Sequence, residues 1–209
     1  MRINGTTIFI PGATSGIGLA LAIRLHDAGN RVIIGGRRTE LLADIAAQHP
    51  GIDTIRIDTT DAASITTAAN EVIARHPDLN VLVPMAGIMR AEDWTTPGSF
   101  LEDAEATLAT NLLGPIRLIS AFIEHLLAQP DATIMTVSSG LAFAPLRPTP
   151  TYNATRPRSI SSARRCGCSS KARAWGSSSS CRRRCRATSS PDTAMTRQRC
   201  PSMSTSTRR

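Results

Sequence analysis

A glycine-rich segment near the N-terminus constrains the fold of this chain more than any other feature. It runs from Gly12 to Gly18, follows the apolar run at residues 7–10 and leads into a second apolar stretch at residues 19–23. Glycines at a turn from a strand to a helix allow the backbone to approach a pyrophosphate, which then binds the free N–H groups at the helix N-terminus. The segment predicts a dinucleotide site formed by Gly12, Thr14, Ser15, Gly16, Ile17 and Gly18.

Beyond this turn, short β-rich runs alternate with amphipathic helical stretches, a pattern typical of a parallel sheet that is covered on both faces. The predicted strands are Thr6–Ile10, Arg31–Gly35, Ile52–Ile57, Val81–Pro84 and Thr133–Ser138. The predicted helices are Gly16–Ala28, Thr39–Gln48, Ala62–Arg75 and Gly98–Ala128, the last in two pieces. Right-handed crossovers then give an α/β, doubly wound sheet with strand order 3-2-1-4-5. Ligands bind beyond the carboxyl ends of such strands.

The glycine-rich turn alone could be an ordinary tight turn, but three later residues point to an enzyme site. Asn111 lies within the sequence at 109–112, Ser139 within 136–140, and Tyr152 follows Ser139 by thirteen residues. Together with the glycine spacing, these residues resemble the short-chain dehydrogenase/reductases of bacteria over residues 5–155. The resemblance implies a Rossmann-like fold that binds a nicotinamide dinucleotide and transfers a hydride between it and a carbonyl or alcohol.

The resemblance also assigns roles to the site residues. In the family, the tyrosine exchanges a proton with the substrate oxygen, and a lysine four residues later lowers the pKa of the phenol. Tyr152 would therefore be the acid/base, Ser139 would polarise the carbonyl, and Asn111 would kink its helix and hold a water in the proton relay. Arg156 stands in place of the lysine. Arginine keeps the positive charge but cannot shuttle a proton.

Pro157 directly follows this substituted position. Because proline disfavours the α conformation in the residue before it, we expect Arg156 not to project from the helical face that carries Tyr152. Pro11 and Pro84 are two further departures from the family pattern, at the ends of neighbouring strands. Each removes a backbone donor near the nucleotide, although changes on adjacent strands can accommodate each other.

Cofactor choice depends on the end of the second strand. NAD enzymes carry an acid there, whereas this chain has Gly36 followed by Arg37 and Arg38. Two guanidinium groups favour a 2′-phosphate, so we expect NADP(H) rather than NAD(H). The alternative is that both arginines are ordinary surface residues at a helix start. The resemblance implies that Asp58 binds the adenine amino group and that Ala86, Gly87 and Ile88 pass beside the adenosine ribose and the inner cofactor.

The net charge of +8 is distributed unevenly along the chain. Residues 1–155 carry ten arginines and fifteen acidic residues, whereas residues 156–209 carry fourteen basic residues, one acidic residue and all five cysteines. The sequence therefore divides into an incomplete dinucleotide-binding domain at 1–155 and an Arg/Ser/Cys-rich tail at 156–209. The tail has few large apolar residues and no periodicity, which predicts disorder and the loss of the later strands of the sheet.

We interpret the tail as the product of a one-base frameshift near Thr155. Shifting the frame of a GC-rich gene turns Arg156 into lysine, which completes the family's Tyr-x-x-x-Lys motif, and turns residues 175–185 into an apolar strand followed by a proline-rich turn. Two alternatives remain for the tail. It could bind RNA or anionic surfaces through phosphate contacts, or its cysteines could bind a metal, although their spacing is not that of a zinc site.

These observations lead to three functional hypotheses. The first is an NADP(H)-dependent oxidoreductase acting on a small carbonyl or alcohol, impaired in this chain; the second is a catalytically dead nucleotide-binding fold; the third is a polyanion-binding protein. The first 155 residues contain no cysteine and the histidines lack ligand spacing, so we expect a cytoplasmic domain without metal, membrane contact or specific nucleic-acid partner. The family forms homo-oligomers, an assembly that we do not extend to this chain.

Overall fold

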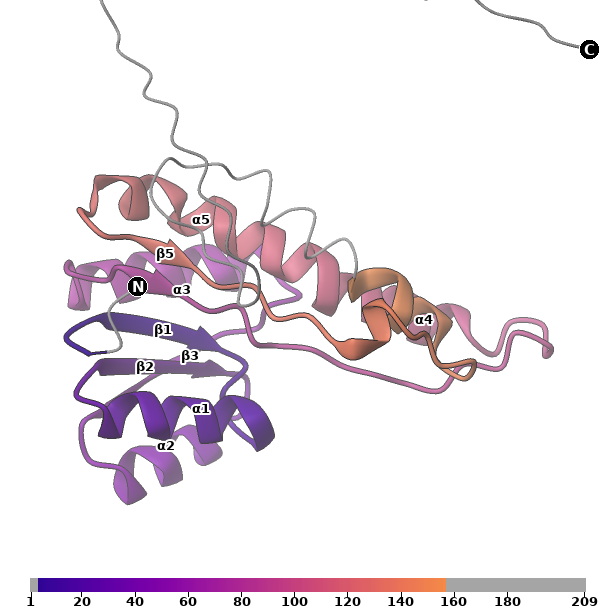
Figure 1. Cartoon of the computed structure of the whole chain (residues 1–209), viewed down its shortest axis with the longest axis horizontal. Coiled ribbons are helices and arrows are strands. Elements are labelled where there is room, and N and C mark those ends of the chain that lie inside the picture. The colour runs from indigo at the N-terminus through magenta and orange to yellow at the C-terminus, as the bar shows by residue number, and fades with distance from the viewer. Residues whose placement is uncertain (1–3, 157–209) are drawn as a thin grey trace, which may run out of the picture. The chain divides into compact units, whose positions relative to one another are not determined.

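The computed structural model of the chain describes residues 4–156, which form a five-stranded parallel sheet with helices on both faces (Figure 1). The strands are β1 Thr7–Pro11, β2 Arg31–Gly36, β3 Ile52–Arg56, β4 Val81–Leu82 and β5 Thr133–Ile134. Their order, β3-β2-β1-β4-β5, confirms the predicted topology. The predicted disorder of the tail and loss of the later strands fall on residues 157–209, outside the described part of the chain.

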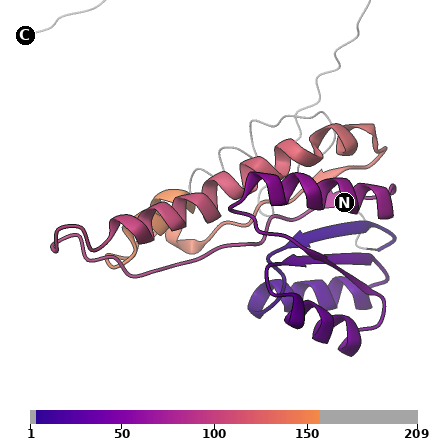
Figure 2. The same ribbon diagram turned by 180° about the vertical axis from the view of Figure 1, so that it is seen from behind.

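Two helices cover each face of the sheet, as the view from behind also shows (Figure 2). Helices α1 (Gly16–Asp27) and α2 (Thr39–Gln48) lie on one face, and α3 (Ala62–Arg75) and α5 (Gly114–Ala128) lie on the other. Because side chains alternate along a strand, β1 supplies both layers. Ile8 and Ile10 pack in the core beneath α1 and α2, whereas Phe9 packs against Phe122 of α5, with ring centres 5.4 Å apart.

One extended helical path occupies residues 101–128. It consists of α4 (Leu101–Leu108), a π-helical segment (Ala109–Leu113) and α5, where a helical region in two pieces starting at Gly98 was expected. Gly98 has a φ of +79°, which is incompatible with a right-handed helix, so the helix begins three residues later. By length and composition alone this path could cross a membrane. Its buried Leu118 and Leu126 nevertheless pack against the sheet as in a core helix.

The strands β4 and β5 are shorter than the predicted Val81–Pro84 and Thr133–Ser138. The Met135 N–H donates to the Leu82 carbonyl, and by the alternation of a parallel ladder the next N–H toward β5 would come from residue 84. Pro84 has no N–H, so the ladder between β4 and β5 stops after two residue pairs. The proline therefore loosens the carboxyl end of the sheet beside the predicted site.

Candidate active site

The turn after β1 brings the glycine-rich segment against the end of β4. Gly12 has a φ of +92°, and a Cβ at this position would lie 2.3 Å from the backbone nitrogen of Ala86. The Ala86 N–H in turn donates to the Pro11 carbonyl at 3.0 Å. A Cβ at Gly18 would lie 2.9 Å from the Gly12 carbonyl oxygen. Only glycine permits this approach, which brings Ala86, one of the residues expected to line the cofactor, against the turn.

Helix α1 presents an open N-terminus at the same place. Its N-cap, Ser15, makes no side-chain capping hydrogen bond, and its first turn contains no acidic residue. The first N–H groups of a helix have no acceptor within the helix, and they attract anions. Gly16 has a φ of +56°, and the side chain of Ile17 is 81% exposed. An uncapped helix end beside closely packed glycines has the geometry and charge that suit the pyrophosphate of a dinucleotide.

The end of β2 lies next to this turn. Gly36 is buried, and a Cβ there would lie 2.3 Å from Cγ2 of Thr14. The Nη2 atom of Arg38 donates to the Thr14 hydroxyl at 3.4 Å. Arg37 and Arg38 are both exposed, so their guanidinium groups are accessible at the end of the strand.

Asp58 lies two residues after the end of β3, the strand next to β2 in the sheet. Its Oδ1 accepts hydrogen bonds from the Thr60 backbone N–H at 2.9 Å and from the Thr60 hydroxyl at 2.7 Å. Burial alone would raise the pKa of the Asp58 carboxyl, but these hydrogen bonds and the charges of Arg37 and Arg56 hold that pKa below its usual value. Asp58 is therefore an ionised acceptor at neutral pH, consistent with the predicted contact to an amino group.

Asn111 lies in the π-helical segment and is 1% exposed. Its Oδ1 accepts from the Ile88 N–H at 2.9 Å, its Nδ2 donates to the Ile88 carbonyl at 2.8 Å, and the same Nδ2 lies 3.5 Å from the Thr155 hydroxyl. The predicted interruption of the helix is confirmed as a π-helical turn. The side-chain amide clamps the backbone that follows β4 at Ile88, a contact that the sequence did not predict.

Tyr152 and Arg156 lie one turn apart on a helix that includes residues 150–156. The guanidinium carbon of Arg156 lies 4.4 Å from the centre of the Tyr152 ring, so the expectation that the two side chains diverge is wrong. The preference imposed by Pro157 on the residue before it did not prevent Arg156 from being helical. A proline also removes only its own N–H from the helical ladder, leaving the hydrogen bonds of the preceding turn possible.

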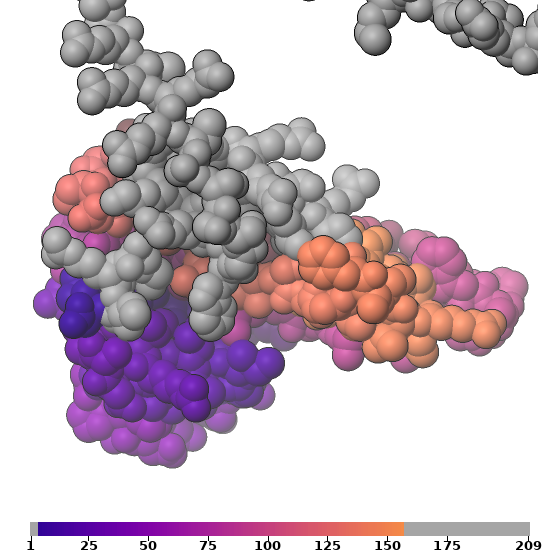
Figure 3. Space-filling view, in the orientation of Figure 1, coloured from indigo at the N-terminus to yellow at the C-terminus, as the bar shows by residue number. Residues whose placement is uncertain are grey.

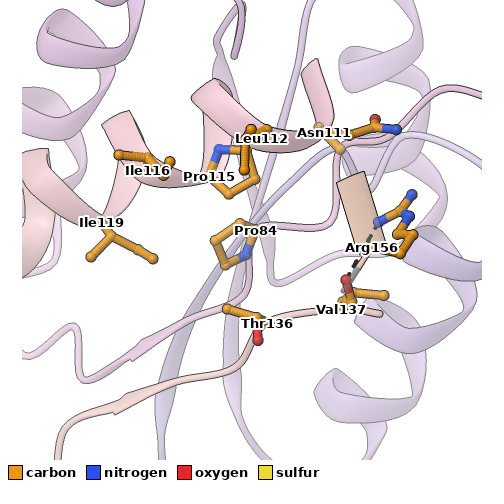
Figure 4. Close-up of a pocket in the computed structure, with 10 residues that line it drawn as sticks. Pro84, Asn111, Leu112, Pro115, Ile116, Ile119, Thr136, Val137 and Arg156 are labelled. Carbon is orange, nitrogen blue, oxygen red and sulfur yellow. Dashed lines mark hydrogen bonds between the residues drawn. The ribbon is translucent and has the colours of Figure 1, made fainter. Parts of the chain in front are cut away.

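The Arg156 guanidinium reaches the centre of the site. Its Nη1 donates to the Val137 carbonyl at 3.4 Å, the contact drawn in Figure 4, and its Nη2 lies 2.8 Å from where a Cβ of Gly87 would be. Its Nε is buried and has no hydrogen-bond partner among residues 4–156. Arg156 borders a small pocket between the ends of β4 and β5 and the start of α5, lined also by Pro84, Ala86, Asn111, Leu112, Pro115, Ile116, Ile119, Thr136 and Val137.

Ser139 lies at the end of the segment after β5, as the N-cap of a 3₁₀ turn, Gly140–Ala142. Its Oγ accepts a hydrogen bond from the Leu141 N–H at 3.2 Å. That bond leaves the proton of the hydroxyl available for donation. Within residues 4–156, no hydrogen bond joins Ser139 to Tyr152. Arg156, by contrast, contacts the Tyr152 ring and borders the same pocket as Asn111.

Two residues that the sequence reasoning missed hold the helix of Tyr152. The Thr155 hydroxyl donates to the Tyr152 carbonyl at 2.7 Å, and the buried carboxylate of Glu92 accepts from the Thr151 hydroxyl at 2.7 Å. The Glu92 N–H also donates to the Pro148 carbonyl at 2.8 Å, so the loop before α4 and the segment before Tyr152 lie side by side (Figure 3). The only sequence signal for these contacts is that Thr151 and Thr155 flank Tyr152.

Comparisons with known proteins give a family and several relatives. The sequence model for short chain dehydrogenases matches residues 6–161. The chain is 40% identical to the uncharacterized oxidoreductase DltE of Bacillus subtilis (strain 168) over 158 residues, which are 75% of this chain and 62% of that protein. It is 31% identical to retinol dehydrogenase 13 of Mus musculus over 144 residues, which are 66% of this chain and 42% of that protein. The chain thus spans less than two thirds of the length of these relatives.

Solved structures show the same fold. A short-chain dehydrogenase/reductase from Brucella melitensis has a TM-score of 0.71 at 27% identity, covering 78% of this chain and 68% of that one. A gluconate 5-dehydrogenase from Burkholderia cenocepacia J2315, in complex with NADP and tartrate, has a TM-score of 0.69 at 28% identity, covering 75% and 62%. A 3-ketoacyl-(acyl-carrier-protein) reductase from Brucella melitensis, complexed with NADH, has a TM-score of 0.72 at 22% identity, covering 78% and 69%, which bears on the fold alone.

Proposed function

The chain belongs to the short-chain dehydrogenase/reductase family of oxidoreductases, and we propose that it is an NADP(H)-dependent member impaired by the residues after Thr155. The proposed reaction is hydride transfer between the nicotinamide and a small carbonyl or alcohol. One observation carries this proposal. Asn111 holds the Ile88 backbone, and Arg156 contacts the Tyr152 ring and reaches Gly87. The adjacent Ala86 packs against Gly12 of the glycine-rich turn.

The preference for NADP(H) rests on the end of β2. The related structures contain NADP in one case and NADH in another, so family membership leaves the preference open. In this chain the strand ends in Gly36, which offers no carboxylate to a ribose 2′-hydroxyl, and the next two residues are exposed arginines. A 2′-phosphate would gain charge-assisted hydrogen bonds from Arg37 or Arg38 without meeting an acid at residue 36.

When bound, the nicotinamide supplies the hydride to a carbonyl carbon or accepts it from an alcohol. As the carbonyl carbon gains the hydride, the electron pair of the C=O bond moves to oxygen, and the Tyr152 hydroxyl would donate a proton to that oxygen. The Ser139 hydroxyl would donate a hydrogen bond to the same oxygen, since Leu141 uses only its acceptor side. Asn111 would fix the Ile88 backbone against which the inner part of the cofactor lies.

Arg156 is the reason to propose impairment. It retains a positive charge beside Tyr152, but a guanidinium group cannot pass a proton onward as a lysine ammonium can. Its guanidinium carbon also lies over the Tyr152 ring, and its Nη2 lies close to Gly87, where the family's lysine would present a compact ammonium group. A second candidate function follows from the same observation: a fold that binds the nucleotide but does not turn over substrate.

The frameshift remains our interpretation of how Arg156 and the tail arose. The family match ends at residue 161, shortly after the predicted slip at Thr155, and the chain covers 62% of the Bacillus relative. Sequencing the gene around codons 155 and 156 tests this interpretation directly. We expect a homopolymeric or GC-rich run there, in which a correction of one base restores a lysine codon at position 156.

The function itself is tested with the full chain by titrating NADPH and NADH separately and following nucleotide fluorescence. We expect tighter binding of NADPH, together with slow oxidation of NADPH when aldehydes, ketones and quinones are added as a panel. Binding without any turnover would support the second candidate. Binding of neither nucleotide would refute both, and equal binding of the two would remove the basis for the NADP(H) assignment.

A further inference from the structure

The contact between Thr14 and Gly36 lies at the position that determines cofactor choice. Gly36 is the last residue of β2, and an ideal Cβ there would lie 2.3 Å from Cγ2 of Thr14, but 3.5 Å from its Cβ and from its Oγ1. Among the described residues, only the Thr14 methyl group therefore conflicts with a Cβ at residue 36, since 3.5 Å is an ordinary van der Waals distance.

The Thr14 side chain is constrained on its other side as well. Its hydroxyl accepts the hydrogen bond from Nη2 of Arg38 at 3.4 Å. A threonine is stiff about χ1, because its Cβ carries two heavy atoms. Rotating the methyl away from residue 36 also rotates the hydroxyl away from Arg38. The methyl and the hydroxyl thus act together, one filling the space at residue 36 and the other orienting a guanidinium group.

We propose that Thr14 is a specificity-determining residue for the cofactor, because its methyl group excludes an acidic side chain at residue 36 while its hydroxyl holds Arg38 near the 2′ position. This inference rests on the proposed function. It implies that conversion to NADH requires two substitutions: an acid at residue 36 and removal of the Thr14 methyl. An acid at residue 36 alone displaces Thr14 and disturbs the turn that binds the pyrophosphate.

The test compares four full-length variants: Gly36→Asp, Thr14→Ser, the double variant Thr14→Ser/Gly36→Asp, and the milder Gly36→Ala. Serine keeps the hydroxyl and removes the methyl, so it separates the two roles. Gly140→Ala is the matched control, because a Cβ at that glycine meets nothing within 4 Å. Thermal unfolding without nucleotide and the Kd values for NADH and NADPH are measured for each variant.

We expect Gly36→Asp and Gly36→Ala to lower the unfolding midpoint by about 3 °C or more, while Gly140→Ala does not, and Thr14→Ser to restore it in the double variant. The double variant should bind NADH at least about 10-fold tighter than Gly36→Asp does, a difference of about 1.4 kcal/mol. The inference is overturned if Gly36→Asp alone binds NADH as tightly as the double variant and has the same unfolding midpoint as the parent chain.

The unfolding midpoints separate this failure from failure of the proposed function. A parent chain that binds neither nucleotide refutes the proposed function and the role of Thr14 in specificity together, even if the midpoints reveal the steric conflict. If the parent chain prefers NADPH and Gly36→Asp alone changes that preference to NADH, only the role assigned to Thr14 is refuted.

Discussion

The guanidinium carbon of Arg156 lies 4.4 Å from the centre of the Tyr152 ring, within the range of a cation–π contact. The two residues are separated by four positions, the spacing at which helical side chains meet. The positive charge of the family's lysine is thus retained close to the phenol-bearing side chain. What is lost is a group that can release and regain a proton.

Replacing Arg156 with lysine should raise the rate of carbonyl reduction at least about 10-fold, since a proton-transferring side chain contributes about 10²–10⁴-fold to such reactions and the rest of the site is unchanged. Initial rates of NADPH oxidation with the aldehyde, ketone and quinone panel provide the measurement. Arg147→Lys, at an exposed position before the helix, is the matched control and should leave the rate unchanged. An unchanged rate in Arg156→Lys would mean that residue 156 does not limit the reaction.

Replacing Arg37 with alanine should weaken NADPH binding by roughly 1–3 kcal/mol and leave NADH binding unaltered, because the lost contact is a charge-assisted hydrogen bond to the 2′-phosphate. Kd values for the two nucleotides, measured at one fixed salt concentration, give the difference. Arg24→Ala, on the exposed part of α1, controls for the loss of one positive charge. Equal weakening of both nucleotides would show that Arg37 acts on the fold or on a shared part of the cofactor.

The order of the strands and the neighbourhood of the glycine-rich turn could be read from the sequence, because both follow from local patterns. Alternating strands and helices admit few topologies, and a glycine at residue 12 suits a turn with a positive φ. The interruption of the helical path at Asn111 was also expected, through the family motif. These features depend on residue type and spacing alone.

The remaining features depend on contacts across the fold. β4 ends early because the backbone of Pro84 faces β5, where an N–H is needed. The sequence of one strand does not show which neighbouring strand each residue faces. The helical conformation of Arg156 went against a local preference of the residue before a proline, and tertiary contacts with Tyr152 and Val137 accompany it. Glu92 was missed because its partner, Thr151, is 59 residues away along the chain.

Replacing Asn111 with leucine should destabilise the chain by about 2–3 kcal/mol, because the Ile88 N–H and carbonyl would both lose a partner. Urea unfolding followed by far-UV circular dichroism gives the free energy of unfolding. Asn70→Ala on the exposed face of α3 is the control, with a change within about 0.5 kcal/mol. A loss no larger than that of the control would show that the clamp on Ile88 is replaceable by solvent.

The stability of the chain should fall in acid partly through Asp53. Burial alone would raise the pKa of this carboxyl, but the hydrogen bond from the Thr54 N–H, the Arg75 charge and the hydrogen bonds from His76 and Arg75 together lower it below 3.8. A carboxyl whose pKa is lower in the folded state contributes stability above its unfolded pKa and loses that contribution as pH falls through the folded value.

Asp53→Asn should therefore flatten the decline of unfolding free energy between about pH 5 and pH 3, relative to the parent chain. Denaturant unfolding at half-unit pH intervals measures the slope. Asp44→Asn, an exposed carboxyl on α2, is the control and should keep the parent's slope. Identical slopes in the parent and in Asp53→Asn would indicate that Asp53 gains nothing from Arg75 and His76.

Restoring the reading frame after Thr155 should increase activity beyond what Arg156→Lys achieves alone. The lysine corrects proton transfer, whereas the restored frame also removes Pro157 and encodes the missing apolar strand and loop, so substrate positioning is recovered as well. The measurement compares three proteins: the parent chain, the Arg156→Lys variant and the chain with the restored frame. Each is assayed at equal soluble concentration with NADPH and the same panel of carbonyls. The expected rates rise in that order. If the chain as written turns over as fast as the restored chain, Arg156 performs the lysine's role, and impairment by the tail is wrong.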